Sequence, residues 1–239
     1  MELKAAKLEL FEHFARVGKA VGSRPRLLLL DLLAQGEKTV DRLARQTGLT
    51  VGNTSAHLKG LRHAALVSTR KEGAHVFYRL AGSDVHEFVR SLQTLAGGQL
   101  AEAREIIDGH FRDPEVLEAV DSADLLERLG AGEVIVLDVR PRDEYAAGHI
   151  PGAISMPYEE IEQHFSELPS DGEIVAYCRG PYCIYAVRAV EALRRAGFQA
   201  RRLEDGIPDW SLRGLPVAVG AAPKPNQGRG NDAFSPISG

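Results

Sequence analysis

Residues 174–198 read IVAYCRGPYCIYAVRAVEALRRAGF, and this stretch decides the fold of the second half of the chain. A short apolar run ending at Cys178 has the length and composition of a buried strand, and the apolar spacing after Cys183 predicts a helix. The loop between them gathers backbone N–H groups beside a helix N-terminus, an arrangement that favours anions. The same surroundings favour thiolate over thiol, so the pattern predicts Cys178 as a nucleophile.

Strands and helices alternate on both sides of this segment. The apolar pattern predicts strands at 133–139, 152–156, 173–178 and 199–203. It predicts helices at 121–129, 142–147, 158–168, 183–196 and 207–213. Continuous apolar strands separated by amphipathic helices indicate an α/β domain with a mostly parallel sheet covered on both faces.

A set of landmarks lies between residues 138 and 216: Asp138-Val139-Arg140, Glu144-Tyr145, Gly148 to Ala153, Cys178, and Trp210 with Gly214-Leu215-Pro216. Through them, residues 117–218 resemble a single rhodanese domain. The resemblance implies a parallel sheet of five strands with helices on both sides. It also implies that Cys178 takes a sulfane sulfur from a donor such as thiosulfate and holds it as a persulfide stabilised by the loop amides. The persulfide then passes its sulfur to a thiol or cyanide.

The loop after Cys178 is assigned to sulfur chemistry and comprises Arg179, Gly180, Pro181, Tyr182 and Cys183. Pro181 removes one backbone N–H from the anion site. Cys183 stands where many active rhodaneses carry Arg or another polar donor. Attack by Cys183 on a Cys178 persulfide would expel sulfide and leave a disulfide. The alternative, given equal weight, is that Cys183 is a small residue packing the end of the loop.

The remaining landmark side chains are interpreted as structural. His149 is expected to fix its loop by hydrogen bonding, and Asp138 and Arg140 are expected to form ion pairs at the strand end. Glu144 is interpreted as a partner on a helix face. Dual-specificity phosphatase activity is not expected, because that chemistry needs Arg six residues after the cysteine and Ile184 stands there.

The N-terminal half contains TVDRLARQTGLTVGNTSAHLKGLRHAALV at 39–67, the pattern of a helix-turn-helix. Gly48 permits the turn, with Leu49 packed beneath it. The second helix, at about 50–63, is expected to bury Leu58 and Leu61. Its exposed side is expected to offer DNA the side chains of Thr50, Asn53, Thr54, Ser55, His57 and Lys59. The run LVSTRKEGAHVFYRL at 66–80 predicts a β-hairpin wing, with Arg70 and Lys71 at its tip and within reach of phosphates.

These segments, together with FARVGKAVGSRPRLLLLDLL at 14–33, closely resemble the ArsR-type winged-helix repressors over residues 8–82. The resemblance implies a homodimer with terminal helices at its interface, which reads an inverted repeat in double-stranded DNA. Metal sensing is rejected for two reasons. Residues 39–43 lack the cysteine pair with which members of this family bind a metal. A second family site would need Asp84 and His86 together with a later His and acidic residue, and Gly97 and Leu100 stand at those later positions. We expect His86 to be a surface histidine, and we expect neither a metal nor a cofactor. A winged helix used only for protein contacts is the alternative.

Charge is distributed unevenly along the chain. Residues 1–82 hold 14 Lys and Arg against 7 Asp and Glu, and the remainder holds 15 against 26, so the two parts carry +7 and −11 of the net −4. A basic first part beside an acidic second part places nucleic-acid binding in the first. No apolar run approaches the roughly 20 residues of a membrane span, and the N-terminus lacks a signal-peptide core. A cytoplasmic protein without a membrane partner is therefore expected.

The sequence thus predicts a mainly α winged helix-turn-helix domain at 1–82 and an α/β rhodanese domain at 117–218. Between them, 83–116 is expected to form a dimerisation helix, interrupted at Gly97-Gly98, and a linker; 219–239 is expected to be a disordered tail. The expected function is a DNA-binding transcriptional repressor whose rhodanese domain senses or transfers sulfane sulfur from a small donor. The alternative is a sulfurtransferase enzyme whose winged helix serves mainly for dimerisation. A third hypothesis is a degenerate rhodanese domain that only binds a ligand.

Overall fold

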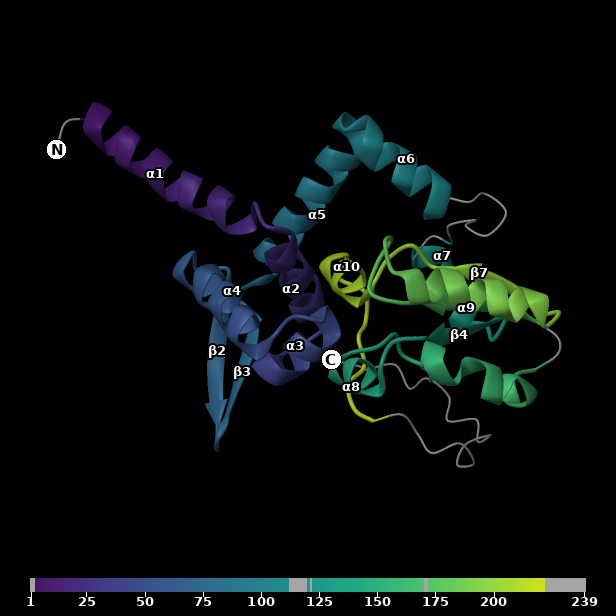
Figure 1. Cartoon of the computed structure of the whole chain (residues 1–239). Helices are drawn as coiled ribbons and strands as arrows, with labels where there is room; N and C mark the ends of the chain where they lie inside the picture. The colour runs from purple at the N-terminus through teal and green to yellow at the C-terminus, as the bar shows by residue number, and fades with distance from the viewer. Residues whose placement is uncertain (1–2, 112–119, 121, 170–171, 222–239) are drawn as a thin grey trace, which may run out of the picture.

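The computed structural model describes residues 3–111, 120, 122–169 and 172–221. Figure 1 shows a helical half with a small hairpin beside an α/β half built around a sheet. The two-domain fold class predicted from the sequence is confirmed. Most of the predicted tail and residues 112–119 of the predicted linker lie outside the described residues. Among the described helices, none is long and apolar enough to span a membrane.

The helical half contains the elements of the winged helix: α1 (Leu3–Val21), α2 (Arg24–Ala34), β1 (Lys38–Thr39), α3 (Val40–Thr47), α4 (Val51–His63), β2 (Val67–Glu72) and β3 (His75–Leu80). The strands form an antiparallel sheet in the order β1-β3-β2. Helix α3 ends at Gly48, whose φ of 71° is left-handed and suits glycine. Helix α4 begins where the Thr50 hydroxyl accepts the backbone N–H of Asn53 at 3.2 Å. Leu43 and Leu58 are fully buried between these helices and α2.

Helices α5 (Ser83–Gln99) and α6 (Ala101–His110) form a bent pair. The break lies two residues later than the predicted one at Gly97-Gly98, because α5 continues through both glycines and ends at Gln99. The bend lies at Leu100, which is extended and both ends α5 and starts α6. Gly97 has a packing role instead. A Cβ atom there would lie 2.9 Å from Ile107 Cδ1, so glycine allows α6 to approach α5 closely.

The α/β half follows the predicted alternation: α7 (Ser122–Gly130), β4 (Val134–Asp138), α8 (Arg142–Ala147), β5 (Ile154–Ser155), the 3₁₀ helix η1 (Tyr158–Glu167), β6 (Glu173–Tyr177), α9 (Ile184–Arg195), β7 (Gln199–Arg202) and α10 (Ile207–Leu212). The sheet is parallel, in the order β5-β4-β6-β7. Beside β7, the described residues contain a single parallel bridge between Val120 and Leu203 in place of the fifth strand that the rhodanese resemblance implies.

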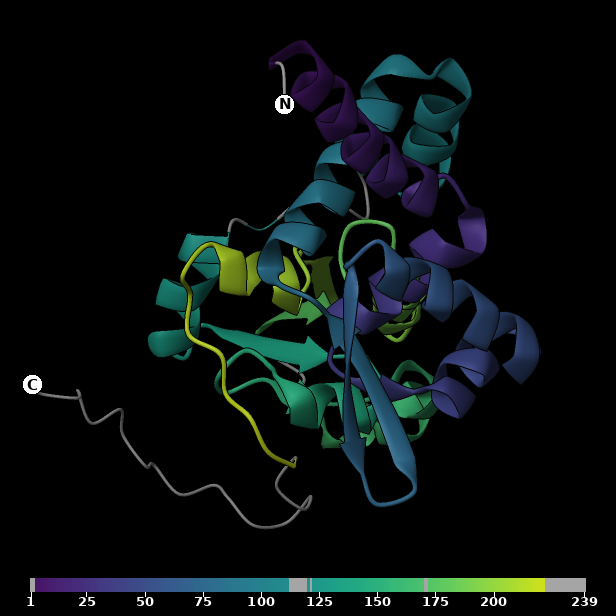
Figure 2. The ribbon, with the colours of Figure 1, turned by 90° about the vertical axis from the view of Figure 1, so that its left-hand side faces the viewer.

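Helices cover both faces of this sheet (Figure 2). Successive strand residues point to opposite faces. Leu137 and Ile174 pack toward α9 and η1, whereas Val136 and Val175 pack toward α7 and α10. Trp210 of α10 is fully buried on the second face. The carboxyl ends of β4 and β6 meet at one edge of the domain, and the loop that follows β6 begins there.

Candidate functional site

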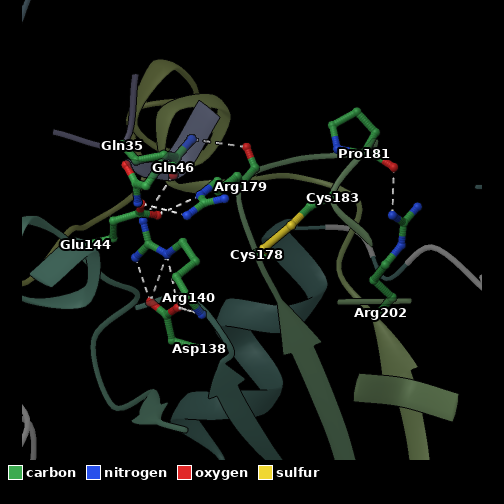
Figure 3. Close-up of a disulfide and its surroundings, with 10 residues drawn as sticks. All are labelled: Gln35, Gln46, Asp138, Arg140, Glu144, Cys178, Arg179, Pro181, Cys183 and Arg202. Atoms are coloured by element: carbon green, nitrogen blue, oxygen red, sulfur yellow. Dashed lines mark hydrogen bonds and ion pairs between the residues drawn. A yellow bond between two sulfur atoms is a disulfide. The ribbon is translucent and has the colours of Figure 1, made fainter. Parts of the chain in front are cut away.

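The two cysteines lie at the carboxyl end of β6. Cys178 directly follows the strand, Cys183 precedes the first residue of α9, and a disulfide joins them (Figure 3). The Cys178 side chain is only 1% exposed, whereas Cys183 is half-buried. The structure therefore joins the two sulfurs, and Cys183 is the more exposed of the two residues.

Hydrogen bonds to carbonyl groups hold the loop between the cysteines. Gln35 of the winged helix donates from Nε2 to the carbonyl oxygen of Arg179 at 3.2 Å. Arg202 of β7 donates from Nη1 to the carbonyl oxygen of Pro181 at 2.7 Å. Gly206 lies so close beneath the loop that a Cβ atom there would be 2.3 Å from the Arg179 carbonyl oxygen. These contacts come from both halves of the molecule, so the loop conformation is linked to each of them.

Glu144 connects the loop to the first helix of the helix-turn-helix. Its fully buried carboxylate accepts hydrogen bonds from Nε and Nη2 of Arg179, both at 2.8 Å. Lys38 Nζ lies 3.5 Å from Oε1 of Glu144, and Gln46 of α3 donates from Nε2 to the same oxygen at 3.3 Å. Burial acts to raise the pKa of Glu144, but the hydrogen bond and charge of Arg179, with Lys38, hold it below the ordinary 4.5. Instead of being a partner on its own helix face, Glu144 lies at the junction between the halves.

Asp138 and Arg140 form the ion pair expected at the end of β4. Both side chains are fully buried, and Arg140 Nη2 lies 2.6 Å from Asp138 Oδ2. The hydroxyl of Tyr177 donates to the same carboxylate at 2.6 Å. Arg140 Nη1 also donates to Oε1 of Gln35 at 3.1 Å. The pair therefore fixes the end of β4. Through Arg140 it also holds Gln35, the winged-helix residue that donates to the sulfur loop.

His149 has the structural surroundings that the sequence predicted. Its Nδ1 lies 2.9 Å from the carbonyl oxygen of Tyr145, and the two rings stack with centroids 3.7 Å apart. These contacts tie His149 to Tyr145 and hold the loop that precedes Ile150.

A second ion-pair cluster joins α5 to α10. Asp209 Oδ1 lies 3.1 Å from His86 Nε2 and 2.9 Å from Arg90 Nε. The prediction of His86 as a surface histidine is wrong, because its contact with Asp209 leaves it only 9% exposed. Burial acts to raise the pKa of Asp209, yet the hydrogen bond from His86 and the charge of Arg90 lower it below 3.8. Sequence analysis missed this cluster, as it missed Gln35 and Lys38, because the partners are more than 100 positions apart.

We expect the junction to lose stability in acid, because Glu144 and Asp209 both have lowered pKa values. A carboxylate of this kind stabilises fully above its unfolded-state pKa, here 4.5 and 3.8, and its contribution is lost as the pH falls through the folded-state value. Thermal unfolding should therefore vary steeply with pH below about 4. Circular dichroism from pH 7 to 3 would measure it. The matched control is the double variant Glu144→Gln with Asp209→Asn, whose curve should be flatter; an unchanged slope would contradict the assignment.

The predicted DNA-facing residues separate into two groups in the structure. Asn53, Ser55 and Lys59 are exposed on α4, Thr50 is exposed at its start, and His57 is half-buried. The prediction that Thr54 faces DNA is wrong. Its side chain is fully buried and its hydroxyl donates to the carbonyl oxygen of Thr50 at 2.9 Å, so it does not lie on the exposed face.

The wing also departs from the prediction. Lys71 is exposed, but Arg70 and Lys71 both lie in β2 before the turn at Gly73 instead of at the tip. The Arg70 guanidinium is paired with the carboxylates of Glu37 and Glu72. A cation already paired with two carboxylates contributes less to an electrostatic attraction toward phosphates than a free one.

Comparisons with known proteins match both halves. The family model of the rhodanese-like domain matches residues 121–213, and that of the bacterial regulatory proteins of the arsR family matches residues 24–69. The HTH-type transcriptional regulator Rv0324 of Mycobacterium tuberculosis is 46% identical over 215 residues, which is 90% of this chain and 94% of the relative. The chain belongs to the arsR family of transcriptional regulators.

Two further relatives each match one half of this ArsR-family regulator. A sulfurtransferase of Allochromatium vinosum is 35% identical over 106 residues, covering 44% of the regulator and 97% of the relative. The solution structure of the homodimeric winged helix-turn-helix DNA-binding domain of Mb0332 from Mycobacterium bovis is 41% identical. The match covers 43% of the regulator and 92% of the solved chain, with a TM-score of 0.39. By the two family models, the regulator combines an arsR-family regulatory domain and a rhodanese-like domain in one chain.

Proposed function

We propose that this regulator is a repressor that responds to sulfane sulfur at Cys178. The observation that carries the proposal is the disulfide pair Cys178–Cys183 at the end of β6, in a loop hydrogen-bonded to the winged helix through Gln35. A chemical change at the sulfurs alters the loop that α2 contacts. That contact gives the chemistry a physical route to the DNA-binding half.

The proposed reaction has two steps. The Cys178 thiolate attacks the outer sulfur of a small persulfide, R–S–SH, whose S–S bond breaks; R–S⁻ leaves and Cys178–S–SH remains. The Cys183 thiolate then attacks Cys178 Sγ, the persulfide S–S bond breaks, and HS⁻ leaves. The product is the Cys178–Cys183 disulfide. In that form Cys178 is covered, so we place sulfur uptake in the reduced protein.

The proposed coupling runs through Arg179 and Glu144. Arg179 is next to Cys178 in the loop and binds the carboxylate of Glu144. The same carboxylate contacts Lys38, just before α3, and Gln46, within α3. In this proposal, a loop closed around the disulfide and a loop with two free thiols differ in the position of Arg179. A difference of this kind shifts DNA affinity only if the two loop forms favour different arrangements of α3.

We further propose a homodimer in which α1 pairs with a second copy of the chain. Helix α1 projects from the helical half (Figure 1), and its apolar side chains Leu3, Leu8, Leu10, Phe11 and Phe14 are 49–91% exposed. A contiguous apolar helix face of this kind marks an interaction surface. Two copies related by a twofold axis would present two α4 helices to an inverted repeat.

The test is operator affinity before and after treatment with polysulfide. An inverted-repeat duplex selected from a random double-stranded DNA pool serves as the probe, with fluorescence anisotropy as the readout. We expect the reduced protein to bind and polysulfide to weaken binding by about 5- to 150-fold, the usual size of a coupling between sites. Cys178→Ser should bind DNA but ignore polysulfide. Cys183→Ser should accumulate the persulfide without the disulfide. Equal affinities in every arm would overturn the proposal.

A sulfurtransferase enzyme is the second candidate, supported by the 35% identity to a sulfurtransferase. Steady transfer of sulfur from thiosulfate to cyanide, together with no selection of any DNA sequence from the pool, would favour this enzyme over the repressor.

A further inference from the structure

A pocket of about 410 Å³ lies between the sulfur loop and the winged helix. Its walls come from both halves of the chain. They include Arg24 and Asp31 of α2, Arg90 and Gln93 of α5, and Cys183 at the end of the loop. The mechanism proposed above uses the disulfide but gives this cavity no role.

One cysteine of the disulfide lines the pocket and the other does not. Cys183 lines it, whereas Cys178 does not and is 1% exposed. A nucleophile held in the pocket therefore meets Cys183 Sγ. Thiol–disulfide exchange depends on which sulfur can be attacked, so Cys178 becomes the leaving group.

The charges around the pocket differ in how they are neutralised. Arg90 is held by Asp209 and donates to Gln93 Oε1 at 2.9 Å. Arg24, at the start of α2, is exposed and makes no ion pair within the described part of the chain. Asp31 is half-buried on the same helix, and burial raises its pKa. Arg179 also lines the pocket but is paired with Glu144, so among the described residues of this wall Arg24 is the arginine without an ion pair, which favours an anionic group on the ligand.

We infer that the pocket binds a low-molecular-weight thiol that carries a carboxylate, and that this thiol reopens the disulfide at Cys183. The inference rests on the proposed function, for which it supplies the resetting step. The thiolate R–S⁻ forms a bond to Cys183 Sγ, the Cys178–Cys183 bond breaks, and its electron pair leaves on Cys178 Sγ. The products are the mixed disulfide R–S–S–Cys183 and the Cys178 thiolate. A second R–S⁻ then releases Cys183 as thiolate and leaves as R–S–S–R.

The first test compares thiols of different charge on the full-length protein oxidised with diamide. Rates of disulfide opening by 3-mercaptopropionate, 2-mercaptoethanol and cysteamine are each divided by the rate of the same thiol with hydroxyethyl disulfide. We expect 3-mercaptopropionate to be the fastest on this scale. Arg24→Ala should slow it about three- to tenfold, as expected for loss of one nearby charge, and leave 2-mercaptoethanol unchanged. Asp31→Asn should act in the opposite direction.

The matched control is Arg195→Ala, which removes an exposed arginine from the far end of α9 and should change none of the three rates. Normalised rates that are equal for the three thiols, or an Arg24→Ala variant with unaltered selectivity, would overturn the inference.

The second test locates the adduct. Trypsin cleaves after Arg142, Arg179 and Arg188, so peptide 143–179 holds Cys178 and peptide 180–188 holds Cys183. Mass spectrometry of the acid-quenched reaction should find 3-mercaptopropionate on peptide 180–188. An adduct mainly on peptide 143–179 would contradict the attack at Cys183. Because diamide forms the disulfide here, these outcomes are independent of the DNA-binding test, in which a failure of polysulfide to act would count against the proposed function alone.

Discussion

Replacing Arg140 with methionine is expected to lower the free energy of unfolding of the α/β domain by about 3–5 kcal/mol, because it leaves a buried carboxylate without its partner. Asp138 and Arg140 are both fully buried, and the guanidinium makes three hydrogen bonds to that carboxylate. A loss of this size is a large part of the 5–15 kcal/mol that ordinarily stabilises a domain.

Urea unfolding followed by fluorescence measures this loss directly. The chain has a single tryptophan, Trp210, and it is fully buried in the α/β domain, so its emission reports on that domain. Arg142→Met is the matched control. Arg142 lies two positions away, is 53% exposed and pairs with Glu160 at the surface, where such pairs contribute about 0–1 kcal/mol. Equal midpoints for the two variants would show that the buried pair contributes nothing beyond a surface pair.

The second large effect is expected for Glu144→Gln, which keeps the size of the side chain and removes its charge. Arg179 and Lys38 then lose the carboxylate that compensates them in a buried site, at a cost of about 3–5 kcal/mol. Since these cations belong to the sulfur loop and to β1, the loss falls on the junction. We expect the two halves to unfold in separate transitions, and polysulfide to form the disulfide without changing DNA affinity.

Differential scanning calorimetry and the anisotropy assay measure the two consequences. Asp143→Asn is the control on the same helix, because the Asp143–Arg42 pair is half-exposed and contributes little. If Glu144→Gln keeps one transition and the full response to polysulfide, signal transfer through Glu144 is excluded.

Local patterns predicted most of the fold. The apolar run before Cys178 and the spacing after Cys183 produced β6 and α9 within about one residue, because a buried strand and an amphipathic helix each follow from the chain's own periodicity. The same holds for α3 and α4, where Gly48 and Thr50 set the turn and the cap. A disulfide between Cys178 and Cys183 was also among the two interpretations of Cys183, since the two cysteines are close in sequence.

The errors concern burial and packing in the folded chain. Thr54 belongs to a helix predicted correctly, yet its side chain is fully buried by the fold. Arg70 was assigned to the wing tip, but the carboxylate of Glu37 comes from before β1 and holds it. Gly97 was interpreted as a break, whereas the packing of Ile107 against it explains the glycine. In each case the deciding neighbour is set by how the chain folds back on itself.

Periodicity, turn residues and the motif around Cys178 act over a few neighbouring residues, and they were enough to predict both domain types and the loop between the cysteines. The relative exposure of the two cysteines and the contact between the halves depend on the tertiary structure. The hydrogen bonds of the junction join residues 98 to 144 positions apart, such as Gln46 with Glu144 and Gln35 with Arg179. Burial and ion pairing depend on those distant partners, and local spacing along the chain does not specify them.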